Sequence, residues 1–170
     1  MKLARAILRI TIGVLFIGHG TQKLFGWFGG RGLDATAESF ESMGLYPGRE
    51  NAIAAGTTEA LGGALLALGA LTPVALGGLV GVMITAVRTV HWKNGVWVTE
   101  GGYEYNLVLI AALLALAEGG PGPLSLDGAL GHGSGSLLEV GGMLGLGAAG
   151  SYATLEVAKR RAPATSGAAA

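Results

Sequence analysis

The chain has no cysteine among its 170 residues. This absence excludes disulfides, thiolate nucleophiles, iron–sulfur clusters and cysteine-ligated zinc within the chain. Any redox chemistry therefore needs a cofactor or a partner protein. We also find no self-contained catalytic motif, so we assign no catalytic residue and expect at most a subunit of an enzyme.

Charge is scarce as well, because Asp, Glu, Lys and Arg make up only 13% of the residues while 51% are hydrophobic. Such a chain is too apolar for an ordinary soluble domain. The 11 basic and 11 acidic residues balance, and no basic surface is evident, so nucleic acid is not an expected partner. The 32 glycines are dispersed among Leu, Ala and Val, as in helices that pack closely in a bilayer. We predict an integral membrane protein.

The strongest single signal is an uncharged run from Ala60 to Val87. As one helix it would be about 42 Å long, which exceeds the ~30 Å apolar core of a membrane. Thr72-Pro73 is the expected turn, because proline lacks an amide hydrogen and disfavours helical geometry before it. The run therefore predicts a helical hairpin, with spans at 51–71 and 74–92.

Two further spans are predicted at 6–24 and 103–117, each close to the minimum length for a tilted crossing. The fold class expected for residues 1–130 is thus all-α, a transmembrane four-helix bundle.

The sequence leaves two arrangements open for the C-terminal part. Residues 131–160 are expected to form a linker and then a helix over about 137–157, either a fifth span or an amphipathic helix at the membrane surface. Gly141, Gly145 and Ala149 follow each other at the spacing of a packed membrane helix, which favours a span. Residues 161–170 are expected to be a disordered tail.

Basic residues set the expected orientation. Lys2, Arg5 and Arg9 precede or begin the first span, which favours a cytoplasmic N-terminus. The three tryptophans, Trp27, Trp92 and Trp97, then fall on the outer side, as an aromatic belt would.

Six ionisable residues fall in the outer half of the predicted spans. They are His19, Lys23, Glu59, Arg88, His91 and Glu104. A charged group in the apolar layer costs at least about 2.5–3.5 kcal/mol, so such groups normally face the bundle interior and pair. We expect a polar cluster in which Glu59 pairs with Arg88 or Lys23.

The cluster offers imidazole, ammonium and carboxylate groups beneath aromatic residues. This chemistry suits the carbonyl oxygens of a quinone or the headgroup of a small anion. Two lone histidines, His19 and His91, are a weak basis for a haem, and no metal site is expected. The alternative is that the cluster only fixes the register and packing of the helices.

Three motifs carry a family resemblance: His19-Gly-Thr-Gln-Lys-Leu24, Glu59-Ala-Leu-Gly-Gly63 and Gly120-Pro-Gly-Pro-Leu-Ser-Leu-Asp127. Together they resemble the DoxX family over about residues 5–130. The resemblance implies a small multi-pass protein of the prokaryotic inner membrane with a four-helix core, related to subunits of thiosulfate:quinone oxidoreductase. His19, Lys23 and Glu59 match the family pattern, whereas Arg88 and His91 rest on the span geometry.

The function expected from these observations is a quinone-docking or accessory subunit of a membrane redox complex. Its partners would be the lipid bilayer and either another protein or a second copy of the chain. Two alternatives stay open: a permease for a small molecule or ion, and a purely structural membrane scaffold. A permease would need a polar path that reaches both sides of the membrane.

Overall fold

The computed structural model describes residues 2–132 and 135–163, and within these ranges the chain is helical with no β-strand. The all-α prediction is therefore confirmed. The α-helices are α1 (Lys2–Phe25), α2 (Gly32–Ser42), α3 (Gly48–Leu68), α4 (Thr72–Ala86), α5 (Glu104–Gly119), α6 (Leu126–Ala129) and α7 (Leu137–Arg161). Short turns of helix, η1 (Trp27–Gly29), η2 (Val87–His91), η3 (Trp92–Asn94) and η4 (Val98–Glu100), lie in the connections. The predicted tail lies outside the described residues from 164 onward.

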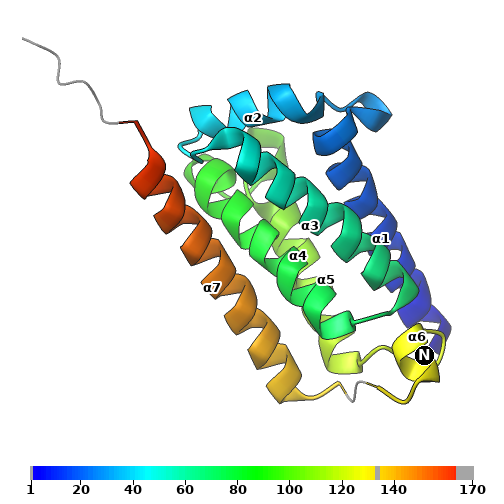
Figure 1. Ribbon diagram of the computed structural model, residues 1–170. Coiled ribbons are helices and arrows are strands. Elements are labelled where there is room, and N and C mark those ends of the chain that lie inside the picture. Colours follow the sequence, from blue (N-terminus) through cyan, green and yellow to red (C-terminus); the bar gives the residue numbers. More distant parts are fainter. Residues whose placement is uncertain (1, 133–134, 164–170) are drawn as a thin grey trace, which may run out of the picture.

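The long helices α1, α3, α4, α5 and α7 run side by side and alternate in direction along the chain (Figure 1). The short α2 lies across one end of this bundle, and α6 lies at the other (Figure 1). We call these the α2 end and the α6 end. The α2 helix was not predicted, because its apolar face is short and interrupted by polar residues.

Glycine lets α1 and α3 approach each other closely. A Cβ atom on Gly20 would come within 2.5 Å of the Gly56 carbonyl oxygen, and one on Gly13 within 2.5 Å of the Gly63 oxygen. The two glycines of each helix are seven residues apart, so they lie on one face. Because the helices are antiparallel, each glycine of α1 meets one of α3. Backbone contact of this kind is typical of membrane helices.

A second glycine contact joins α4 and α7. Gly147 of α7 lies against Gly77 and Gly81 of α4, where a Cβ on Gly147 would be 3.0 Å from backbone atoms of both. The expectation that Gly141 and Gly145 form the packing face of this helix is wrong, since a Cβ at either would meet open space. The helix packs instead with the roughly opposite face, which carries Met143, Gly147 and Ser151, because Gly77 and Gly81 of α4 form a small-residue groove there.

The turn between α3 and α4 is confirmed, although it lies at Gly69–Leu71, just before Thr72-Pro73. Gly69 ends α3 with a φ of 65°, and any side chain there would collide with the guanidinium of Arg9. Leu71 also has a positive φ, of 46°, which costs free energy in a residue other than glycine. The turn is thus held by contacts from outside it.

Asp127 supplies those contacts. Its carboxylate accepts hydrogen bonds from the Leu71 amide (3.0 Å), the Thr72 amide (2.8 Å) and the Thr72 hydroxyl (2.6 Å). It therefore caps the first turn of α4, whose amides have no partner within the helix. Burial by itself would raise the pKa of Asp127, but the hydrogen bonds from Thr72 and Leu71 outweigh it and hold that pKa below its usual value.

Arg9 also holds the α3–α4 turn in place. Its guanidinium is buried, with 3% of the residue exposed, and it donates to the carbonyl oxygens of Pro121 (3.3 Å) and Leu124 (2.6 Å). The motif from Gly120 to Asp127 therefore lies over the α3–α4 turn. Its role in the structure is to hold this turn at the α6 end.

In the described part of the chain, two helical stretches are long and apolar enough to cross a membrane, Lys2–Phe25 and Thr72–Asn94. The second joins α4 to the η2 and η3 turns. The α5 helix has only 16 residues, and α3 and α7 are not among the stretches that pass the same test. The positions of all predicted spans nonetheless coincide with helices.

Candidate functional site

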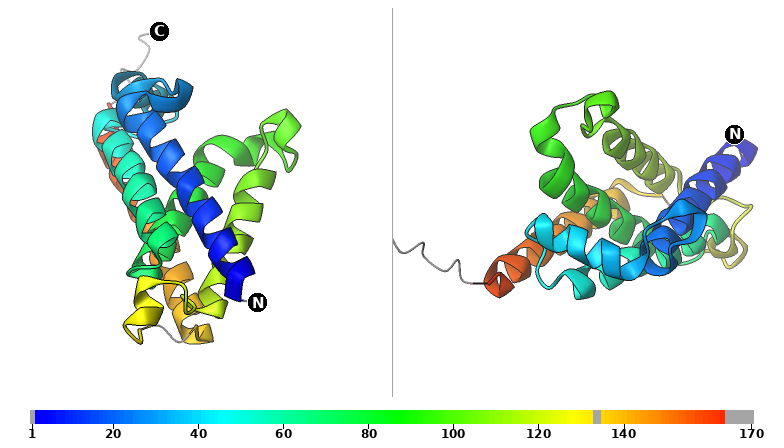
Figure 2. Two further views of the ribbon diagram at one scale, coloured as in Figure 1. Left: turned by 90° about the vertical axis from the view of Figure 1, so that its right-hand side faces the viewer. Right: turned by 90° about the horizontal axis from the view of Figure 1, so that it is seen from above.

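A cavity of about 720 Å³ has most of its lining in the half of the bundle nearer the α2 end and extends along α4 as far as Val74. Side chains from α1, α3, α4, α5 and α7 line it, mostly apolar ones. It exists because the α4–α5 hairpin leans away from α1 and α3 toward this end (Figure 2). In the other half of the bundle the helices close on a buried apolar core that includes Leu66, Leu76 and Leu113.

The wall of the cavity carries an ion pair. Lys23 Nζ of α1 lies 2.6 Å from Glu59 Oε2 of α3, with 4% of the Glu59 side chain and 25% of the Lys23 side chain exposed. The close approach of α1 and α3 at Gly20 and Gly56 brings the two residues to the same height. Of the two partners expected for Glu59, Lys23 is confirmed.

The pairing of Glu59 with Arg88 is wrong. Arg88 lies in η2, a turn of π-helix, and its side chain is exposed. A π-turn holds more residues than an α-turn, so it rotates Arg88 away from the direction that regular α-helical spacing predicts.

His19 also lines the cavity, one turn before Lys23 on α1. Its Nδ1 lies 3.1 Å from Gln22 Oε1. The Gln22 amide nitrogen donates to the Phe28 carbonyl, so Oε1 faces His19. Because Oε1 can only accept, Nδ1–H of His19 is the donor of this hydrogen bond. The Nε2 atom of His19 is then the nitrogen left for a ligand.

The other two predicted residues flank the loop between α4 and α5, His91 at the end of η2 and Glu104 as the first residue of α5. His91 lines the cavity and its Nδ1 donates to the Gly101 carbonyl oxygen at 2.7 Å. Glu104 Oε2 accepts from the Val98 amide at 2.9 Å, and Glu104 is not part of the cavity lining. Both hydrogen bonds shape the loop. The structure therefore gathers His19, Lys23, Glu59 and His91 at the cavity and leaves Arg88 and Glu104 outside it.

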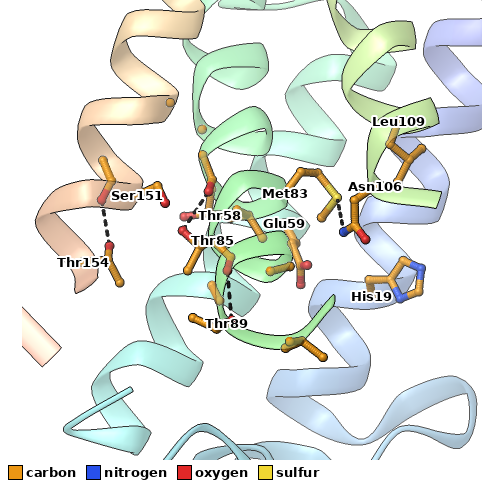
Figure 3. A pocket seen from close by; sticks show the side chains of 18 of the residues that line it. His19, Thr58, Glu59, Met83, Thr85, Thr89, Asn106, Leu109, Ser151 and Thr154 are labelled. Atoms are coloured by element: carbon orange, nitrogen blue, oxygen red, sulfur yellow. Dashed lines mark hydrogen bonds between the residues drawn. The ribbon is translucent and has the colours of Figure 1, made fainter. Parts of the chain in front are cut away.

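Sequence reasoning missed several neutral polar residues of the wall. Asn106 of α5 is buried and its amide donates to the sulfur of Met83 at 3.5 Å, a weak acceptor. Ser151 of α7 and the threonines Thr58, Thr85 and Thr154 also line the cavity (Figure 3). An amide within the otherwise apolar stretch of α5 was the signal available for Asn106. Nothing in the sequence marks which face of α7 turns inward.

The arrangement offers hydrogen-bond donors and acceptors to an uncharged polar ligand with an apolar body. Within the described residues, no three His, Asp or Glu side chains gather closely enough to hold a metal ion.

A family model described as DoxX matches residues 4–92 of the chain. The match includes the ion pair, His19 and His91, and ends before Asn106 and Ser151. No curated protein and no solved structure is significantly similar to the chain.

Proposed function

The chain belongs to the DoxX family, and from that premise we propose that it is a multi-pass inner-membrane protein whose cavity docks a quinone for a membrane redox complex. Its own residues would bind and orient the quinone headgroup. Electrons would come from a partner protein, since the chain has no cysteine and no evident cofactor motif.

The observation that carries this proposal is the Lys23–Glu59 ion pair on the cavity wall. A buried ion pair is weak support for stability, because the desolvation of two charges offsets most of their attraction. Ionisable groups within a membrane interior are more often found at functional sites. The pair places an ammonium donor beside a space that His19 and Asn106 also face, and such donors suit quinone carbonyl oxygens.

The volume and lining of the cavity agree with that ligand. A volume of about 720 Å³ lies within the range of small-molecule sites, which are mostly apolar with a few well-placed polar groups. A quinone has the matching chemistry, an apolar ring and tail with two carbonyl acceptors.

The distribution of polarity favours docking over transport. The polar side chains of the cavity lie toward the α2 end, and the apolar core around Leu66, Leu76 and Leu113 separates them from Arg9 and Asp127 at the α6 end. A permease would need a continuous polar path between the ends.

The proposed topology has residues 1–130 as the membrane domain with four spans and α7 as a fifth. Support comes from α7 lying along α4 over most of its length, so it is not arranged as a surface helix would be. With a cytoplasmic N-terminus, five spans put the C-terminus outside. A topology reporter fused after Ala162 tests this, because a cytoplasmic signal would show that α7 does not cross.

Quinone docking is tested on the full chain, purified from native membranes in mild detergent. Extraction should release quinone from the wild type and from Glu50→Gln, but little from Glu59→Gln. Glu50 is the matched control because it is an exposed, paired glutamate of the same helix. Wild-type protein that carries no quinone and binds none when it is added would refute the proposal. An unchanged quinone content per molecule in Glu59→Gln, with lower abundance, would favour the scaffold.

A redox partner should be recovered in the same purification. Its identity follows from the proteins that co-purify in proportion to the chain. Recovery of the chain alone, or only as a homo-oligomer, would contradict a role as a subunit of a redox complex.

A further inference from the structure

Ser151 is the one described serine or threonine whose buried hydroxyl oxygen lacks a hydrogen-bond partner. It lies on α7 with 1% of the residue exposed, and it lines the cavity. A buried hydroxyl without a partner is costly, so one that is kept in this state is usually satisfied by a molecule that the chain itself does not supply.

Two other hydroxyls of the cavity wall differ from Ser151 in this respect. Thr85 donates to the Gly81 carbonyl oxygen and Thr154 to the Gly150 oxygen, both at 2.9 Å. These are ordinary bonds to the preceding turn of the same helix, and they use the only hydrogen of each hydroxyl. Ser151 alone among the three retains a free donor.

The surroundings of Ser151 give the helix no evident use for its hydroxyl. On the inward face of α7 it lies between Gly147, which packs on α4, and the buried Ala158. Alanine would fill the position with one atom fewer and leave nothing unpaired. The hydroxyl is therefore better explained by the cavity than by the packing of α7.

Ser151 lies at the opposite side of the cavity from His19. In Figure 3 the α7 residues Ser151 and Thr154 are at one side and His19 and Asn106 at the other, with Glu59 between them. Figure 1 agrees, since α7 and α1 flank the bundle on opposite sides. The cavity thus presents polar groups both on its α7 side and on its α1 side.

We propose that Ser151 is a second anchor for the ligand and donates a hydrogen bond to one carbonyl oxygen of a para-quinone, while the His19, Lys23 and Glu59 region receives the other carbonyl. This inference rests on the proposed function. A para-quinone fits it because its two acceptors lie at opposite ends of a planar apolar ring. The assignment makes α7, which lies outside the residues matched by the DoxX model, part of the binding site.

The test compares the wild type, Ser151→Ala and Thr154→Val as full-length proteins in detergent. Each is titrated with 2,3-dimethoxy-5-methyl-1,4-benzoquinone, and its thermal unfolding is measured with and without that quinone. Thr154→Val is the control, because it removes a hydroxyl from the same helix and cavity whose hydrogen is already bonded to backbone.

We expect Ser151→Ala to bind the quinone about tenfold more weakly, which is the loss of about one good hydrogen bond. Without quinone, Ser151→Ala should unfold at the same temperature as the wild type or higher, since an unpaired group is gone. Thr154→Val should bind like the wild type. A merely structural serine would give the opposite pattern, with a lower unfolding temperature and unchanged affinity.

The two ways of failing are distinct. If the wild type binds the quinone and Ser151→Ala binds it equally well, the second anchor is refuted and the proposed function stands. If the wild type binds no quinone, the proposed function itself fails, and the anchor with it.

Discussion

Alanine at Gly20 should separate α1 from α3, and alanine at Gly18 should not. A Cβ on Gly20 would lie 2.5 Å from the Ala60 nitrogen and 2.5 Å from the Gly56 oxygen, whereas a Cβ on Gly18 would meet nothing within 4 Å. Carbon contacts are most favourable near 3.5–4.0 Å. The helices must therefore move apart by about 1 Å to accept Gly20→Ala.

The pair of variants isolates the cost of that movement. Overpacking of a tight contact typically costs about 1–3 kcal/mol. Replacing glycine by alanine inside a helix gains about 1 kcal/mol from backbone propensity, and this gain is common to both variants. We expect Gly20→Ala to be less stable than Gly18→Ala by about 1–3 kcal/mol, with Gly18→Ala at or above the wild type.

Thermal unfolding in detergent micelles, followed by tryptophan fluorescence, measures the difference. In a soluble protein of this size each kcal/mol corresponds to about 2–4 °C in Tm, so the two variants should separate by several degrees. Equal Tm values for Gly18→Ala and Gly20→Ala would refute the glycine contact. A second readout is ligand binding, because Lys23 lies one turn beyond Gly20 and its 2.6 Å pairing with Glu59 should loosen.

Three further predictions test other parts of the structure. Lys23→Met should lower the free energy of unfolding in detergent by about 3 kcal/mol, which is the lower end for breaking a buried ion pair, because the Lys23 side chain is 25% exposed. Adding Glu59→Gln to this variant should recover most of the lost stability. No recovery in the double variant would contradict the pairing. Gly147→Leu should lower the Tm through collision with α4, while Gly145→Leu, at a position with open space, should not. The low pKa of Asp127 in the folded protein adds stability, which is fully present above the unfolded pKa of about 3.9 and is lost as the pH falls through the folded pKa. Between about pH 5 and 3 the Tm should therefore fall less in Asp127→Asn than in the wild type. An equal dependence of Tm on pH in the two proteins would count against the cap.

Much of the framework followed from the sequence. The uncharged run after Glu59 was too long for one crossing, and the proline marked the region of the turn within a few residues. The burial of Glu59 and the choice of Lys23 as one of its two candidate partners could also be predicted, because a charge in the middle of an apolar helix needs a partner.

Other features depended on helix rotation, which spacing alone does not fix. Arg88 shares an expected face with His91 only if the helix stays α-helical, and the π-turn at Val87–His91 removes that condition. Similarly, α7 has several candidate small-residue faces, and the one that packs was selected by Gly77 and Gly81 of α4.

By itself, the sequence determined that the chain is helical and apolar, about where it turns, and that Glu59 needs a charged partner within the bundle. These follow from hydrophobicity and chain geometry, which are local properties. Only the tertiary structure decided that Lys23 is the partner of Glu59, that Asp127 caps a turn 56 residues before it, and that Ser151 lies at the cavity with an unpaired hydroxyl. Such contacts depend on how closely and at what rotation the helices pack, and that is fixed by the glycines of both partners together.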